Sequence, residues 1–429
     1  MLCDTLPLLA QSLKTIRDKP VYAGRIKKLY EASARVFRSL HLLDNPVHRA
    51  SAVDDNKTRP SNTIRTAAEA YTRILYDYVS RLKYERGKEA LSERFKFQDI
   101  TAVWHLFEIT LLRGDTSAVQ SRQLMDWLNK TQRADLLKFD IQGIFNCSDP
   151  LNHPFFWPYV YKLVLRSEMD SLVQLLHVAE RRANPSHDSP CHTLTWIITH
   201  MPSTPKYRHN TDDEAFLSEF DTWKQELAKT RQKYQSMSFS TPHFHSSLYA
   251  LDILCGNADV IRAYASSSLE ALVAILYYGY PLSTIDTIYQ EYPLQDEVMM
   301  ETRWKVFDKL FQGDVYGVLE ECTGLDPWLL AHMCDLLALS GQLTEPIYLH
   351  SQVDLYRPVS IRSFFIMEYA ASICSQSIWP YAFDYLRTCN DIGQECMNEI
   401  IKWVHPSDGG EEMLLQRLCE EYGLILDRS

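Results

Sequence analysis

The chain has 429 residues, of which 46% are hydrophobic and 12% aromatic, so it can form roughly two or three ordinary domains or one long solenoid with a large core. Its 44 basic and 55 acidic side chains give a formal net charge of 44 − 55 = −11, which disfavours binding to a phosphate backbone. Only 14 residues are glycine, and no apolar run approaches the ~20 residues of a membrane-spanning helix, which argues against glycine-rich nucleotide-binding loops and a membrane span.

Helical periodicity begins near the amino terminus, and residues 1–43 are predicted to hold N-terminal helices. The second of these carries Ile26, Leu29 and Phe37 on one face. Residues 44–62 form a predicted polar loop, because the residue before Pro46 avoids the helical region and the following residues are mostly polar. Residues 63–429 are predicted to form one continuous unit.

Short helices separated by polar loops fill this unit. They are predicted over residues 63–86, 97–112, 117–128, 153–165, 167–181, 213–234, 244–254, 259–264, 268–277, 283–289, 360–375, 379–388, 392–404 and 411–422. Residues 183–190 and 201–211 are predicted loops, and no alternating strand of useful length lies between the helices. The pattern indicates an all-α fold.

Residues 301–341 show this organisation most clearly, as three short helices joined by tight turns. Asp314 and Asp326 are placed to cap the second and third helices, and Pro327 suits the first helical position. Leu336 lies on the apolar face of the third helix, and Gly341 ends that helix because glycine adopts a left-handed conformation without a Cβ penalty.

A short motif recurs where helices are joined: two apolar residues, a spacer, a small turn residue and a polar cap. It occurs at residues 111–115, 164–168, 253–257, 310–314 and, loosely, 338–342. The uneven intervals argue against a fixed-period repeat and predict an irregular α-solenoid of antiparallel helix pairs. A second similarity relates residues 156–161 to 378–383, each with Trp-Pro at a helix start, and core packing is its main interpretation.

The search for catalytic chemistry is negative, so no catalytic, cofactor-binding or metal-binding residue is assigned. The sequence has no phosphate-binding glycine loop, no Gly-x-Ser-x-Gly elbow and no His-Glu-x-x-His helix. His187 and Asp188 lie in a loop rich in proline and serine, and His243 and His245 are two residues apart. These four side chains are the candidate ligands of an all-α metal-dependent hydrolase, which we keep as an alternative from another functional class.

The remaining polar and sulfur-containing candidates have structural interpretations. His332 and Asp335 interrupt an apolar helix, where a hydrogen-bonded pair or an exposed helix edge is the main interpretation and a partner-facing spot is the alternative. Helix capping or solvent exposure explains the neighbouring acids Asp314, Glu320, Glu321 and Asp326. The ten cysteines contain no Cys-x-x-Cys pair, and Cys389 and Cys396 are expected to be buried, inert thiols of a reducing compartment.

Several stretches are similar to a known family. They are HPFFWPYVYKLVLRSEMDSLVQLL from His153, GDVYGVLEECTGLDPWLLAHMCDLLALSG from Gly313, PVSIRSFFIMEYAASICSQSIWPYAFDYLRTC from Pro358 and GQECMNEIIKWV from Gly393. These stretches resemble the eighty-five-kilodalton nucleoporin family of the Y-shaped scaffold complex of the nuclear pore. The similarity is firmest over residues 153–404.

This resemblance implies an ancestral coatomer element, an α-solenoid that folds back on itself into trunk, crown and tail. It implies a non-enzymatic scaffold in the nucleus, at the nuclear pore complex of the nuclear envelope, that supports pore assembly, protein import and mRNA export. A vesicle-coat or membrane-traffic α-solenoid is the alternative within the same broad class.

The resemblance also implies partners, namely the other Y-complex nucleoporins. One is an open β-propeller nucleoporin, which the family completes with an inserted β-blade, and another is the hub of the complex, reached through the carboxyl-terminal tail. No direct nucleic-acid contact, small-molecule substrate or cofactor is implied. Two features differ from the family pattern: this chain begins with predicted helices rather than blade strands, and family members continue beyond the region that ends at Ser429.

Overall fold

The structure, a computed structural model, describes residues 24–42, 62–112, 117–132, 139–182, 189–202, 210–237, 242–295, 302–344, 346–349, 357–374, 378–404 and 409–424. The chain forms two compact units. Unit 2 is the internal segment Asp115–Gly313, and unit 1 joins the segments Met1–Gly114 and Asp314–Ser429. The described residues of both units are overwhelmingly helical, which confirms the all-α prediction.

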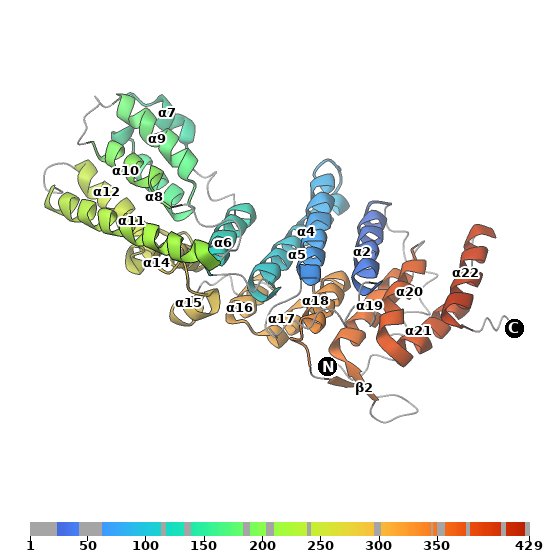
Figure 1. The fold of residues 1–429 in the computed structure, drawn as a ribbon. Coiled ribbons are helices and arrows are strands. Elements are labelled where there is room, and N and C mark those ends of the chain that lie inside the picture. Colours follow the sequence, from blue (N-terminus) through green and yellow to red (C-terminus); the bar gives the residue numbers. More distant parts are fainter. Residues whose placement is uncertain are drawn as a thin grey trace. The chain divides into compact units, whose positions relative to one another are not determined.

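Unit 1 contains the following elements, labelled as in Figure 1: α2 (Gly24–Leu42), α4 (Asn62–Leu82), α5 (Lys88–Phe107), the π-helix η2 (Glu108–Leu112), α17 (Val315–Cys322), α18 (Pro327–Leu339), β1 (Pro346–Leu349), β2 (Arg357–Ser360), α19 (Ile361–Cys374), α20 (Pro380–Leu386), the 3-10 helix η6 (Arg387–Cys389), α21 (Asn390–Trp403) and α22 (Gly409–Tyr422). The helix predicted before residue 24 lies outside the described ranges. So does the polar loop predicted over residues 44–62, except for residue 62. Those boundaries, and the continuity of residues 63–429, stay predictions.

The two segments of unit 1 share one core, so the chain folds back on itself within this unit. α4 and α5 pack against α18, and α2 packs against α20 (Figure 1). The indoles of Trp104 and Trp328 lie 5.3 Å apart between ring centroids, and both are buried. Trp104 Nε1 donates to Thr72 Oγ1 at 3.0 Å, and Trp328 Nε1 donates to Ser33 Oγ at 2.8 Å. Each large aromatic ring thus buries its apolar surface while its polar atom keeps a partner.

The two short strands of unit 1 were not predicted from the sequence. β1 pairs with β2 in antiparallel register, with Ile347 opposite Val359. Each strand has four residues and contains a proline, at Pro346 and Pro358, so the alternating pattern that identifies longer strands cannot develop.

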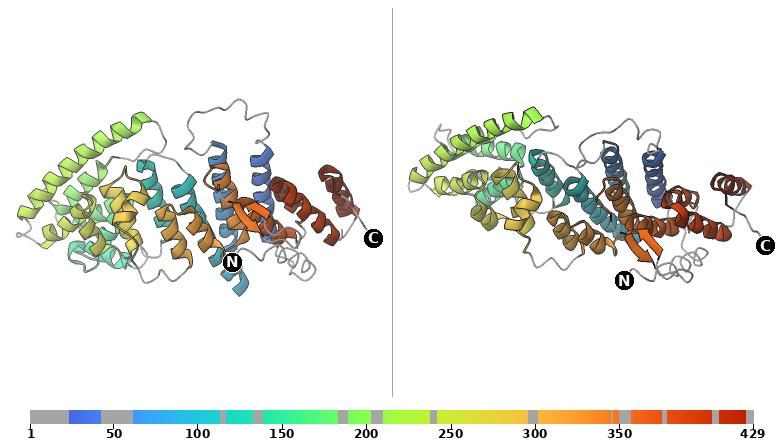
Figure 2. Two further views of the ribbon diagram at one scale, coloured as in Figure 1. Left: turned by 90° about the horizontal axis from the view of Figure 1, so that it is seen from below. Right: turned by 60° about the horizontal axis from the view of Figure 1, so that its bottom comes forward.

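Unit 2 contains α6 (Ser117–Thr131), α7 (Ile141–Asn146), the 3-10 helix η4 (Pro150–Asn152), α8 (Phe156–Leu165), α9 (Met169–Arg182), α10 (Pro190–Thr199), α11 (Asn210–Met237), α12 (Pro242–Leu254), α13 (Ala258–Tyr264), α14 (Ser268–Gly279), α15 (Ile285–Glu291) and α16 (Thr302–Gln312). α6 packs on α14, α8 on α12, and α9 on α10. The long helix α11 packs on α12 and lies at the edge of this unit in both views of Figure 2.

The recurring turn motif has a common backbone geometry. Its small residue adopts a positive φ at Ser167 (53°), Gly256 (80°), Gly313 (69°) and Gly341 (77°). At three of these turns, the next amide donates to the carbonyl five residues earlier, at 2.9–3.0 Å. This is the Schellman arrangement, which satisfies carbonyls at the end of a helix. The fifth copy, at residues 111–115, is incompletely described.

Across the described ranges, no helix has the length and apolarity needed to cross a membrane.

Candidate functional site

The four candidate metal ligands do not form a described site. His187 and Asp188 lie outside the described residues. His243 stacks on Trp157 with ring centroids 6.5 Å apart, and the exposed His245 ring lies 3.2 Å from the Tyr249 hydroxyl. Nowhere in the described ranges do three His, Cys, Asp or Glu side chains gather in a way that could hold a metal ion. The hydrolase alternative gains no support from this arrangement.

The two capping aspartates perform the predicted local role. Asp314 Oδ1 accepts a hydrogen bond from the Gly317 amide at 2.9 Å, and Asp326 Oδ1 accepts from the Trp328 amide at 2.8 Å. The second oxygen of Asp326 lies 2.6 Å from Lys96 Nζ of α5. Asp326 therefore caps α18 and also links the two segments of unit 1.

Cys389 and Cys396 are buried, as predicted. Cys389 Sγ lies 3.8 Å from the Tyr385 carbonyl, and Cys396 Sγ lies 3.6 Å from Met367 Sδ. Burial raises the pKa of the Cys389 thiol to about 11. The thiol is protonated at neutral pH and is a poor nucleophile.

His332 is fully buried and bonded within the fold. Its Nδ1 lies 2.6 Å from the Trp328 carbonyl, and its Nε2 lies 3.0 Å from the Tyr385 hydroxyl. A carbonyl can only accept, so Nδ1 donates and Nε2 accepts from the tyrosine. Burial lowers the pKa of His332 to about 4, and the ring is neutral at physiological pH. The side chain is internal and does not face a partner.

Asp335 is also buried, but it does not pair with His332. Its two carboxylate oxygens lie 3.0 Å from His41 Nε2, and Oδ1 accepts from Arg362 Nε at 2.7 Å. Arg362 also donates to the backbone carbonyl and the hydroxyl of Thr388 at 3.0 and 2.9 Å. Burial by itself raises the pKa of Asp335, but Arg362 and His41 outweigh it and hold that pKa below its ordinary value. The Asp335 carboxylate thus joins α2, α18 and α19, and Arg362 extends the network to η6.

A second buried polar network lies in unit 2, and the sequence analysis did not find it. Arg166 and Glu270 are fully buried, and Lys162 is almost so. Glu270 accepts from Arg166 Nε, from Lys162 Nζ at 2.6 Å and from the Ser266 amide at 2.6 Å. Arg166 Nη1 also donates to the Leu128 carbonyl at 3.2 Å. This network connects α6, α8 and α14.

One feature of the sequence could have identified Glu270. Ser267 and Glu270 have the spacing of a capping box, and the Ser267 hydroxyl accepts from the Glu270 amide at 3.2 Å. That pattern places Glu270 in the first turn of α14. It does not show that the carboxylate turns inward to meet two cations.

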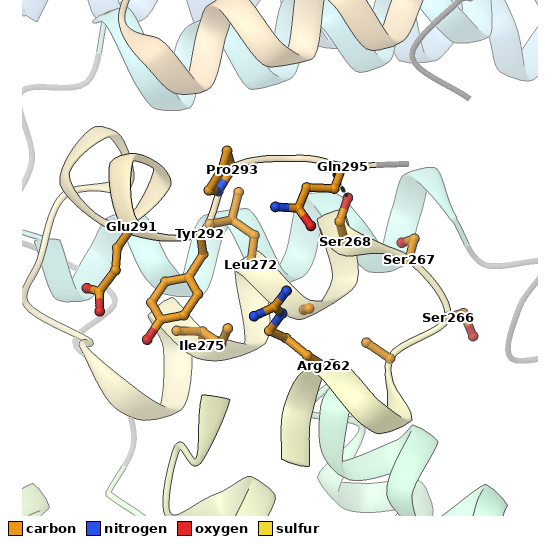
Figure 3. A pocket seen from close by; sticks show the side chains of 12 residues that line it. Arg262, Ser266, Ser267, Ser268, Leu272, Ile275, Glu291, Tyr292, Pro293 and Gln295 are labelled. Carbon is orange, nitrogen blue, oxygen red and sulfur yellow. Dashed lines mark hydrogen bonds between the residues drawn. The ribbon is translucent and has the colours of Figure 1, made fainter. Parts of the chain in front are cut away.

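A polar pocket of about 280 Å³ lies beside the start of α14 (Figure 3). Its polar lining includes Arg262, Ser266, Ser268, Glu291 and Gln295; Figure 3 shows Gln295 beside Ser268 and Glu291 at the opposite side of the view. The Ser268 hydroxyl accepts from the backbone amide of Gln295 at 3.2 Å, and the Ser266 hydroxyl accepts from Lys162 Nζ at 2.5 Å. The described lining contains no histidine or cysteine. These hydrogen bonds hold the polar lining to its neighbours within unit 2.

Comparison with known proteins assigns the chain to a family. The family model described as Nup85 Nucleoporin matches residues 14–426. The chain belongs to the Nup85 nucleoporin family. Nup85 nucleoporins are structural components of the nuclear pore and not a family of enzymes.

Three curated relatives illustrate the similarity of this Nup85 chain. Nucleoporin nup85 of Schizosaccharomyces pombe is 22% identical over 82% of the chain and 52% of its own length. Nuclear pore complex protein Nup85 of Danio rerio is 22% identical over 94% of the chain and 62% of its own length. Nuclear pore complex protein Nup75 of Drosophila melanogaster is 23% identical over 95% and 63%. The chain thus spans less than two thirds of the length of each of these relatives.

Proposed function

We propose that the chain is a structural scaffold of the nuclear pore complex at the nuclear envelope, where it supports pore assembly, protein import and mRNA export. The match of the Nup85 family model to residues 14–426 carries this proposal. The internal use of the polar side chains supports it, because His332, Asp335, Arg166 and Glu270 all serve packing between helices.

The proposed partners are the other nucleoporins of the Y-complex, including a β-propeller nucleoporin and the hub of the complex. These proteins would bind to surfaces of the chain, and the proposal includes neither a cofactor nor a small-molecule substrate. We also propose that unit 2 corresponds to the crown of the fold-back solenoid and unit 1 to its trunk and the beginning of its tail. The division of the chain into an internal unit and a unit built from both flanks supports this assignment.

The test is affinity capture of the tagged full-length gene product from its own cells, together with fluorescence imaging. We expect a nuclear-rim signal and recovery of Y-complex nucleoporins. Leu336→Asp is a suitable control, because loss of the unit 1 core should abolish both the nuclear-rim signal and the recovery of nucleoporins. A signal at endoplasmic reticulum exit sites with recovery of coat proteins would favour the vesicle-coat alternative. A folded protein with neither signal would contradict the proposal.

A further inference from the structure

α2 and α4 form a groove on the surface of unit 1. α2 contributes Ala32, Val36 and Leu40, and α4 contributes Thr66, Ala67 and Ala70. We call this surface the α2–α4 groove. It has a volume of about 560 Å³, and its lining is mainly apolar or small.

Ala32, Val36 and Ala70 of the groove lie beside the buried stripes of their helices, whereas Leu40 and Ala67 are themselves buried. On α2, the stripe that packs against unit 1 includes Leu29 and Phe37, whereas Ala32 and Val36 remain partly exposed. On α4, Tyr71 and Leu75 are fully buried, whereas Ala70 is partly exposed. The groove residues recur at intervals of three or four, which is the spacing that one helix presents to another.

Small side chains along such a seam let another helix approach closely. Ala32 and Ala70 are partly exposed and carry no atoms beyond Cβ, and the partly exposed Val36 adds apolar surface. Leu40 and Ala67 line the groove as buried residues. Helices pack by inserting side-chain ridges into grooves of this kind. An amphipathic helix laid into an apolar groove is a recurring mode of peptide recognition.

The charges around the groove indicate the charge of a partner that would fit it. Arg35 is exposed in the groove, and Lys28 is exposed where the seam continues toward the start of α2. The two acids at that end are already engaged, since Glu31 pairs with Lys27 and Asp77 pairs with Arg81. In the part of the chain that the structure describes, Lys28 and Arg35 make no such ion pair. The groove therefore presents two available cations beside an apolar floor, which complements an acidic helix.

We propose that the α2–α4 groove is a docking site for an amphipathic helix of another protein. The bound helix has a face of small and apolar residues and carries aspartate or glutamate where it passes Arg35 and Lys28. This inference is independent of the proposed function, because it rests on the groove itself.

Site-specific photo-crosslinking tests the proposal. A benzophenone amino acid replaces the exposed Thr66 in the full chain, which is expressed in its own cells and irradiated, and the crosslinked peptide is sequenced. We expect a peptide from another protein with helical apolar spacing and an acidic residue near the crosslink. Isotope-labelled and unlabelled copies are mixed, so that an adduct between two copies is recognised.

Matched variants connect the adduct to the groove. Arg35→Glu reverses the central charge, and Lys83→Glu makes a similar reversal at an exposed position outside the groove. We expect Arg35→Glu to reduce the adduct at least tenfold and Lys83→Glu to leave it within twofold of the parent. Ala70→Trp fills the groove and should also abolish the adduct. The thermal midpoint of each variant is measured, and an Ala70→Leu variant, which also adds bulk in the groove, replaces Ala70→Trp if the latter unfolds.

Several results would overturn the proposal. They are an adduct within the same chain, an adduct with a second copy, a crosslinked peptide without acidic residues, and no adduct from a folded protein. Equal loss in Arg35→Glu and Lys83→Glu would overturn the charge argument. Nuclear-rim localisation is scored separately. A chain that crosslinks as expected but does not reach the rim would contradict only the proposed function.

Discussion

His332 lies among aromatic rings in unit 1, with the Tyr71 ring 4.6 Å and the Tyr369 ring 5.3 Å from its own. Its pKa is about 4 in the folded chain against an ordinary 6.5, so between these values the unfolded chain binds the proton and the folded chain does not. The contribution of this group to stability is therefore complete above pH 6.5 and falls as the pH is lowered toward 4. Between pH 7 and pH 4.5 we expect the titration of His332 to lower the free energy of unfolding by about 2–3 kcal/mol.

The measurement is urea unfolding at both pH values for the parent chain and for His332→Gln, whose amide can still form hydrogen bonds but does not titrate. Other groups titrate in both proteins, so only the difference between the two pH dependences counts. An equal loss of stability in parent and variant would contradict the assignment.

Glu270 provides the second prediction at the residue scale. Glu270→Ala removes the carboxylate that meets Arg166 and Lys162, which leaves two buried cations without it. Breaking a buried pair in this way costs about 3–5 kcal/mol. Glu226→Ala is the matched control, because Glu226 pairs with Lys229 on the surface at 2.6 Å, and such pairs contribute about 0–1 kcal/mol. Chemical denaturation should give Glu270→Ala a much lower free energy of unfolding than Glu226→Ala, and Glu226→Ala a value close to the parent's. A similar small loss in both variants would count against the network.

The residues that the sequence identified correctly act locally. Asp314 and Asp326 cap the helices that follow them, and their roles depend on neighbours two or three positions away. The bond between His41 and Asp335 joins residues 294 positions apart, and periodicity carries no information about such a pair. The inward turn of Arg166 is hidden for the same reason, since an arginine at a helix end is ordinarily exposed.

At the scale of elements, the turn motif predicts how glycine substitutions behave. Gly341 has a φ of 77°, and a Cβ added there would meet no atom within 4 Å, so backbone strain alone decides the outcome. We expect Gly341→Ala to destabilise unit 1 by about 1–2 kcal/mol. Gly324 is equally open but does not have a positive φ, so Gly324→Ala should be neutral or stabilising by about 0.4–1 kcal/mol. Equal thermal midpoints for the two variants would show that the left-handed turn is not required.

The apolar face of α18 gives a larger expected effect. Leu336 is fully buried, and Leu336→Asp would place a carboxylate in the core of unit 1. The expected loss is more than about 3 kcal/mol, against a total stability of about 5–15 kcal/mol for a domain. Leu91→Asp is the control, because Leu91 on α5 is 47% exposed. Circular dichroism during thermal unfolding compares them, and an unchanged midpoint for Leu336→Asp would contradict its burial.

The element boundaries from sequence are accurate where a buried stripe is continuous. The predicted helix over residues 268–277 corresponds to α14, Ser268–Gly279. α5 begins nine residues before its predicted start at residue 97, because its first turns expose Leu91 and Phe95 and bury little besides Ala90. α10 was not predicted, since proline- and serine-rich segments flank it and its first residue, Pro190, was assigned to the preceding loop.

At the scale of the molecule, the sequence predicted helix pairs and a fold-back, but not which helices share a core. The amphipathic stripe of α2 shows that it must pack against something, and its partners α4 and α20 lie on opposite sides of the internal unit in the sequence. Arg38 of α2 reaches Asp384 of α20 across 346 positions, at 3.0 Å between Nε and Oδ1. The motif similarity to a family implied the fold-back, and the structure identifies the residues that make it.

The division into units predicts which fragments fold. Residues 115–313 contain both partners of the Arg166–Glu270 pair and the contact between Trp127 and Phe307, whose rings lie 5.0 Å apart, so this fragment should unfold cooperatively by itself. Residues 1–114 and 314–429 divide the Trp104–Trp328 contact and the His41–Asp335 bond between them. Each alone would expose a large apolar surface, and we expect neither to fold until the two are mixed. Heteronuclear NMR spectra of the single fragments and of the mixture measure this, and a dispersed spectrum from residues 1–114 alone would contradict the shared core.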